Sequence, residues 1–192
     1  ARFGRLIAAQ EILDSNFGYG VNENRAFHVN LASHEIKPIG PQALLLIDIS
    51  KASKEGLQRE NIRFSLLGDG DMVNGQTGAV KIAENKSVIP KSIRTANEWD
   101  LPDGIWKDDE FAAFFPDWLV ANSGEAIIED EHFQFVFTKD SRTLVRSTYE
   151  DPYGDVSAVN LRVDIYPKES AQQAAIDLAE ELRNTVVIEE EL

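Results

Sequence analysis

Residues 159–182 read VNLRVDIYPKESAQQAAIDLAEEL, and this run indicates the fold class more clearly than any other part of the chain. Apolar and polar residues alternate from Val159 to Tyr166, which is the period of a strand that buries one face. Pro167 follows, and proline cannot donate a backbone hydrogen bond to a neighbouring strand. We therefore expect a strand that lies in a sheet and ends at Pro167.

The same run continues with the pattern of a helix. Ser170 and Gln173 have the spacing of a capping box, which begins a helix. One apolar stripe follows at helical spacing, and it consists of Ala171, Ala174, Ala175, Leu178, Ala179 and Leu182. Val186–Ile188 has the composition of a last strand, so that strand, helix and strand would form a right-handed crossover.

Most of the chain before this unit has strand patterns separated by turns. We expect strands at residues 27–31, 44–49, 62–66, 80–82, 133–137 and 143–149. The segment 44–49 is nearly all apolar, which predicts a central strand that is covered on both faces. Lys139–Arg142 has the composition of a turn, and it would join the last two of these strands as a hairpin.

A short helix is expected near the N-terminus, over residues 6–13, with Leu6, Ala9 and Leu13 on one side. About eight strands with few helices, and the clearest helices at the two ends, predict an α+β fold. We expect a mostly antiparallel sheet or sandwich with a short N-terminal helix and a C-terminal strand–helix–strand unit.

The composition limits the class of protein. The chain is 43% hydrophobic and 27% charged, which is typical of a folded domain, and we expect a single domain over 1–192. It has no cysteine, which excludes disulfides and thiolate chemistry. No apolar run approaches the ~20 residues needed to cross a bilayer, and no signal-peptide pattern is present. We therefore expect a cytoplasmic or virion-associated protein with no membrane partner.

The charge is divided sharply along the chain. Lys and Arg outnumber Asp and Glu by twelve to ten up to Arg94, whereas from Thr95 onward they number seven against twenty-three. A surface of such acidity repels phosphates, so direct nucleic-acid binding is not expected. Instead, the near-neutral half of one copy could contact the acidic half of the next, which is a head-to-tail arrangement that builds rings or filaments.

Motifs for cofactors and common hydrolases are missing. Gly18–Gly20 lacks the third glycine of a dinucleotide loop, and no Gly-Lys-Ser/Thr or Gly-x-Ser-x-Gly occurs. His28 and His34 share a face of one expected strand, but six residues at ~3.3 Å each place them about 20 Å apart. We therefore predict neither a cofactor nor a metal site.

Two groups of residues are candidates for a binding interface. The first lies in the acidic, tryptophan-rich connecting segment 95–122 and consists of Trp99, Trp106, Phe111, Phe115 and Trp118. Aromatic residues among carboxylates suit a protein interface, a sugar or a cationic partner, or else they close one end of the core. The second group is a basic patch on an expected helical face, and its alternative is an ordinary solvated surface. It consists of Lys51, Lys54 and Arg59.

Carboxylates offer a catalytic alternative. Asp48 interrupts an apolar run, where it is either a catalytic acid near a strand end or the cap of the following turn. Asp69 and Asp71 lie in a glycine turn that is either part of an ion site or a plain hairpin turn. These three residues are the candidates for a carboxylate-dependent hydrolase, with Trp99 or Trp106 for stacking on a sugar.

We therefore predict a non-enzymatic structural or interaction subunit that forms a homo-oligomer through protein contacts, as part of a phage-like or secretion-like assembly. One alternative is the carboxylate-dependent hydrolase or a carbohydrate-binding protein. Another is an acidic inhibitor or immunity protein whose carboxylates mimic nucleic acid. The acidic runs that would serve this last role are residues 108–110, 129–131 and 189–191.

Overall fold

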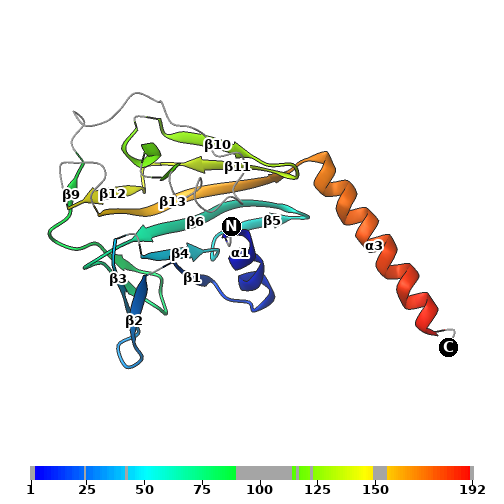
Figure 1. Cartoon of the computed structure of the whole chain (residues 1–192), viewed down its shortest axis with the longest axis horizontal. Helices are drawn as coiled ribbons and strands as arrows, with labels where there is room; N and C mark the ends of the chain where they lie inside the picture. The colour runs from blue at the N-terminus through cyan, green and yellow to red at the C-terminus, as the bar shows by residue number, and fades with distance from the viewer. Residues whose placement is uncertain are drawn as a thin grey trace.

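Two antiparallel sheets make up most of the structure, which is a computed structural model (Figure 1). It describes residues 3–23, 25–41, 43–89, 114–115, 117–121, 123–148 and 155–190, and for 181–190 it describes the backbone alone. In the order of the chain, a short N-terminal helix comes first and a strand followed by a long helix comes last. The predicted α+β class and mostly antiparallel pairing are thus confirmed.

The larger sheet contains β1 (Phe17–Val21), β4 (Leu44–Asp48), β5 (Ser53–Glu55), β6 (Gln58–Leu67), β9 (Ser87–Val88), β10 (Glu125–Glu129), β11 (Phe133–Thr138), β12 (Leu144–Ser147) and β13 (Val156–Pro167). The smaller sheet contains β2 (Ala26–Asn30), β3 (Glu35–Ile39), β7 (Met72–Asn74) and β8 (Val80–Lys81). The main path of the larger sheet is β1-β4-β6-β13-β11-β10, so the two longest strands, β6 and β13, are neighbours at its centre.

Both faces of the larger sheet are partly covered. On one face, α1 (Phe3–Ile12) and the helical residues 114–115 and 117–120 enclose an aromatic core around Phe64 and Phe137. On the other face, Leu44 and Leu46 pack with residues of the smaller sheet. The prediction that segment 44–49 forms a strand covered on both faces is confirmed, because β4 contributes to both cores.

Helix α1 confirms the expected N-terminal helix but buries a different side. Its buried residues are Phe3, Ile7 and Gln10, whereas the predicted Leu13 is exposed. The helix begins at Phe3, and this large aromatic side chain takes the helix face at i, i+4 and i+7 into the core. The Nε2 of the buried Gln10 side chain donates to the carbonyl of Ile47 in the sheet at 3.2 Å.

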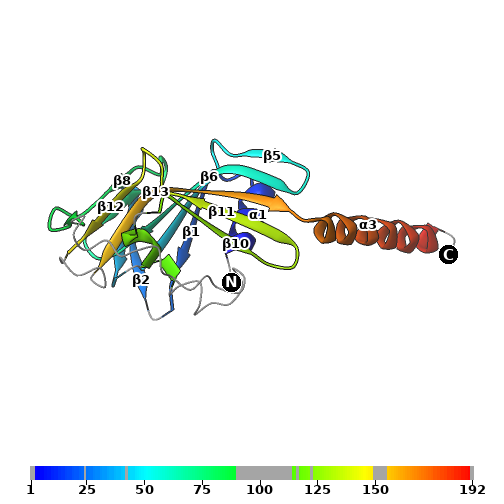
Figure 2. The ribbon, with the colours of Figure 1, turned by 90° about the horizontal axis from the view of Figure 1, so that it is seen from above.

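The C-terminal unit differs from the prediction. Helix α3 spans Glu169–Glu190 without interruption, so Val186–Ile188 is helical and no crossover forms. Figures 1 and 2 show α3 extending away from both sheets. A strand there would have no neighbour to satisfy its backbone, whereas a helix satisfies its own, and this outweighs the β-branched composition. The expected capping box is not used either, because the Ser170 hydroxyl donates to the Glu131 carbonyl at 2.6 Å.

Three local predictions are also corrected. Strands β11 and β12 do not pair with each other; both pair with β13, which they meet at residues 162–167 and 156–159. The segment expected to carry Lys51, Lys54 and Arg59 on a helix is the β5–β6 hairpin, whose turn includes Gly56 at φ 54°. A turn separates β2 from β3, so His28 and His34 do not lie on one straight strand.

Candidate interaction surfaces

The two aromatic candidates that the structure describes do not form a surface. Phe115 and Trp118 lie in the core, where the exposed fraction of Trp118 is 0%. Trp118 stacks on Phe114 with ring centroids 5.8 Å apart and meets Phe137 edge-on. The ammonium of Lys139 lies 5.1 Å from the Trp118 ring and donates to the Trp118 carbonyl at 2.6 Å. These two side chains therefore close the core, which is the alternative that the sequence left open.

The remaining three aromatic candidates, Trp99, Trp106 and Phe111, lie outside the described residues. The same holds for the acidic run 108–110. The other two acidic runs are placed: 129–131 lies at the turn between β10 and β11, and the last helical residues of α3 include Glu189 and Glu190.

The three carboxylates of the hydrolase alternative lie in separate environments. Asp48 caps the following turn by accepting from the Ser50 amide at 2.8 Å, and it lines a hollow of about 210 Å³ with Arg63. Asp69 accepts from the Gly40 amide, at the edge of the smaller sheet. Asp71 is buried in an ion pair with Lys86. Within the described ranges no three His, Cys, Asp or Glu side chains gather as metal ligands, and these three carboxylates have different partners.

The basic candidates belong to a surface that the sequence indicated only in part. We name it the α1–hairpin surface, and it consists of Arg5, Ile12, Leu13, Lys51, Lys54, Leu57 and Arg59, contributed by α1, the residue after it, the β4–β5 connection and the β5–β6 hairpin. A hollow of about 140 Å³ opens between the helix and the hairpin. Its lining is Ile7, Glu11, Ile49, Ala52, Ser53, Lys54, Arg59 and Ile62. The hollow thus has an apolar floor and a charged rim.

Ion pairs hold the two parts of this surface together. Lys54 and Arg59 are directly opposite each other across the hairpin, and both reach Glu11 on α1. The Lys54 ammonium lies 2.7 Å from the carboxylate, and Nη2 of Arg59 donates to it at 2.9 Å. The hydrogen bonding of Arg59 is the main cause that lowers the pKa of Glu11 to about 2; Lys54 adds to the effect, and partial burial opposes it.

Apolar side chains at the end of α1 are exposed, directly after Glu11, which lines this hollow. The exposed fraction of Ile12 is 83% and that of Leu13 is 75%. Sequence analysis placed Leu13 on the buried side of the helix, so it could not identify these residues as surface. Two large aliphatic side chains in sequence, next to a hollow with an apolar floor, are typical of a contact site.

Helix α3 is the second candidate surface. Of its side chains from Glu169 to Glu180, only Ala171 is buried. The apolar stripe predicted from the sequence therefore begins against the sheet and continues into solvent. Leu178 of this stripe is 56% exposed, and Ile176, which lies on the other side of the helix, is 52% exposed. A helix normally turns such a stripe toward other protein, and within the described residues nothing covers it.

The two surfaces differ in charge. Between Glu169 and Glu180 the helix carries three acidic residues and no basic residue. On the α1–hairpin surface Arg5, Lys51 and Lys54 are exposed, whereas Glu11 is half-buried. The sequence signal of a near-neutral first half and an acidic second half therefore corresponds to two places that can be named in the structure.

Comparisons with protein families, with curated proteins and with solved structures find no match for this chain. Among the residues that the structure describes, no helix has the length and apolar character needed to cross a bilayer. The arguments for function therefore rest on the two surfaces and their chemistry.

Proposed function

We propose that this protein is a non-enzymatic interaction subunit that assembles with copies of itself. Helix α3 of one copy docks on the α1–hairpin surface of the next. The observation that carries the proposal is the exposure of α3, whose apolar stripe lies in water from Ala174 to Ala179. An apolar helix face without a partner indicates a contact that another molecule completes.

The apolar parts of the two surfaces match in kind and size. Leu178 projects from the helix, while the exposed Ile12 and Leu13 follow Glu11, which lines the hollow of about 140 Å³. Burying one such side chain stabilises a contact by roughly 1.5–3 kcal/mol, so two or three of them give a contact worth measuring. A second copy is the favoured occupant because the same chain supplies both halves.

Charge supports the same pairing. Asp177 and Glu180 lie near Leu178 along α3, and Lys54 lines the hollow. Opposite charges at the rim of a contact guide its orientation and speed its formation, and salt screens them. We therefore expect the assembly to loosen when the ionic strength rises.

This contact joins two different surfaces and is heterologous, so a pair of copies still has one free donor helix and one free acceptor surface. Contacts of this kind close into rings or continue as filaments. An extended assembly of a phage-like or secretion-like kind is the role that we propose for the subunit.

The test is to mix two variants, each of which keeps one half of the contact. Leu178→Asp disables the helix and leaves the α1–hairpin surface intact, while Ile12→Asp does the reverse. Light-scattering mass after size exclusion should show wild-type assemblies, two monomeric variants, and a one-to-one dimer when the variants are mixed. Leu31→Asp is the matched control, because Leu31 is also 83% exposed but lies on the turn between β2 and β3.

Each outcome decides the proposal. A dimer that forms only in the mixture supports a heterologous contact between these two surfaces. Wild-type protein that remains monomeric at every concentration and salt would refute self-assembly. Assemblies that persist in Leu178→Asp would place the contact elsewhere, and variants that stay monomeric together would exclude this pairing of surfaces.

A further inference from the structure

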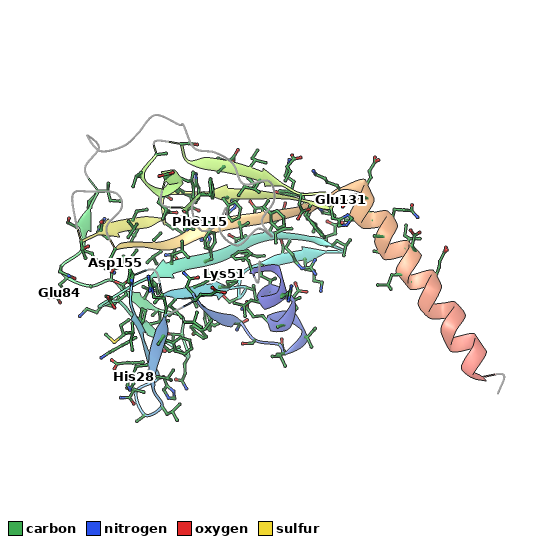
Figure 3. The ribbon with its side chains drawn as sticks, viewed as in Figure 1. His28, Lys51, Glu84, Phe115, Glu131 and Asp155 are labelled. Carbon is green, nitrogen blue, oxygen red and sulfur yellow. The ribbon has the colours of Figure 1, made fainter. Side chains whose placement is uncertain are left out.

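A buried cluster of charged side chains lies at the end of the larger sheet that is remote from α3. Figure 3 shows Asp155 at the start of β13, and the cluster forms around it. The Lys86 ammonium lies 2.8 Å from the Asp155 carboxylate, 3.1 Å from that of Asp71 and 2.8 Å from the Ser157 hydroxyl. The side chains of Lys86 and Asp71 are 0% exposed, and that of Asp155 is 13% exposed.

The cluster joins segments that are far apart in the chain. Asp71 precedes β7, Lys86 precedes β9, and Asp155 and Ser157 belong to the start of β13. Taking a lysine and two carboxylates out of water costs several kcal/mol for each ion, and an ion pair returns this cost only in part. A reaction that neutralises charges in such a buried cluster would therefore be favourable.

We propose that Lys86 and Asp155 form an intramolecular amide bond. Nζ of Lys86 bonds to Cγ of Asp155, one Cγ–O bond breaks, and one water leaves. The ammonium first gives a proton to the Asp155 carboxylate, so that a neutral amine attacks a neutral carboxyl group. The reaction needs no oxidant or cofactor, and it replaces two buried charges by a neutral amide.

Asp71 acts as the proton relay for this step. It contacts Nζ, so it accepts a proton from the nitrogen as the new bond forms and donates it to the departing oxygen. It is therefore ionised before and after the reaction. Desolvation makes a lysine amine nucleophilic, and the exclusion of bulk water protects the reacting groups from competing hydrolysis.

The hydrogen bonds identify Asp155 rather than Asp71 as the acyl partner. Asp71 accepts from the amides of Gly68 and Ala83, both at 2.9 Å, and from the hydroxyl of Ser157. Attack at its carbon would disrupt all of these bonds. Asp155 is instead pressed on Gly68, where a Cβ would come within 2.1 Å of its Oδ1, so the glycine admits the carboxylate to the lysine.

The first experiment is the intact mass of the unfolded wild-type chain. We expect a mass lower by one water than the sequence dictates, and a branched peptide after proteolysis that joins Lys86 to Asp155. Lys86→Arg keeps the positive charge but cannot form this amide, so it should have its full mass. A water loss that persists in Lys86→Arg would be a succinimide and would overturn the proposal.

Asp155→Asn gives a sharper test. Its side-chain amide can react with the lysine by releasing ammonia in place of water, and the branched peptide should then be identical to that of wild type. Asp155→Ala should give no branched peptide. A wild-type chain of full mass, or a branch that joins Lys86 to Asp71, would refute the assignment; the wild-type measurement is decisive even if a variant does not fold.

Discussion

The first and last helices, α1 and α3, differ in how they pack against the rest of the chain. Helix α1 is ten residues long and packs on the larger sheet, with Phe3 and Ile7 in the core and Glu11 held by the β5–β6 hairpin. Helix α3 is twenty-two residues long and buries one alanine among its described side chains. The longer helix with the clearer stripe therefore contributes less to the fold.

This difference shows that an amphipathic pattern predicts that a helix face will be covered but does not identify the molecule that covers it. The apolar face of α1 is covered by its own sheet. Helix α3 extends away from the sheets after β13 ends, and we propose that a second copy covers its apolar face. If this is right, the side chains of α1 contribute to folding and those of α3 contribute to association.

The largest expected effect distinguishes the two helices directly. Ile7→Ala removes a side chain from the core and should lower the free energy of unfolding by about 3 kcal/mol. Leu178→Ala should change it by less than about 0.5 kcal/mol, because the side chain is exposed in the monomer. Denaturant unfolding at low protein concentration and high salt measures both. Equal losses for the two variants would mean that α3 packs on its own chain.

A middle-sized effect tests the ion pairs that fix α1. The pKa of Glu11 is lowered to about 2 in the folded state, from its ordinary value of 4.5. Its contribution to stability is therefore complete above pH 4.5 and is lost as the pH falls from 4.5 toward 2. Because the pair is partly exposed to solvent, we expect about 1 kcal/mol. Glu11→Gln should show this loss at neutral pH and a weaker pH dependence in that window.

Asp177→Asn is the matched control on the other helix. Its carboxylate is exposed on α3 and accepts a hydrogen bond from Gln173 at 2.7 Å, one turn away on the same helix. The free energy of unfolding of the monomer should be unchanged by this substitution, both at neutral pH and between pH 4.5 and 2. A pH dependence that is the same in Glu11→Gln and in wild type would exclude the ion pairs as its source.

Much of the fold followed from local patterns. Alternation predicted the centre of β13, and the continuous apolar run predicted that β4 is covered on both faces. These predictions succeed because each depends on one segment and the period of its own side chains. The predicted pairing of 133–137 with 143–149 failed because it depends on a distant strand, β13, which takes both partners.

The candidate sites were less accessible to the sequence. Large aromatic side chains such as those of Phe115 and Trp118 suit either a core or a surface. Only their packing against Phe137 shows that they belong to the core. No sequence pattern indicated a role for Lys86, because the residues that contact it, Asp71 and Asp155, lie in other segments of the chain. Lys54 and Arg59 lie opposite each other in a hairpin and not on a helix, and Lys51 precedes this hairpin in the β4–β5 connection.

The smallest expected change in stability gives the clearest test of the difference between the two helices. A chain that ends after Gln173 keeps the buried Ala171 and the hydrogen bond from Ser170 to Glu131, and loses the remainder of α3. The melting temperature of the monomer should barely move, because the removed side chains from Ala174 to Glu180 have no burial to lose. The mass of the assembly should fall to that of a monomer, since the donor half of the contact is gone. A large drop in melting temperature would instead show that α3 stabilises its own body, and α1 and α3 would then differ only in degree.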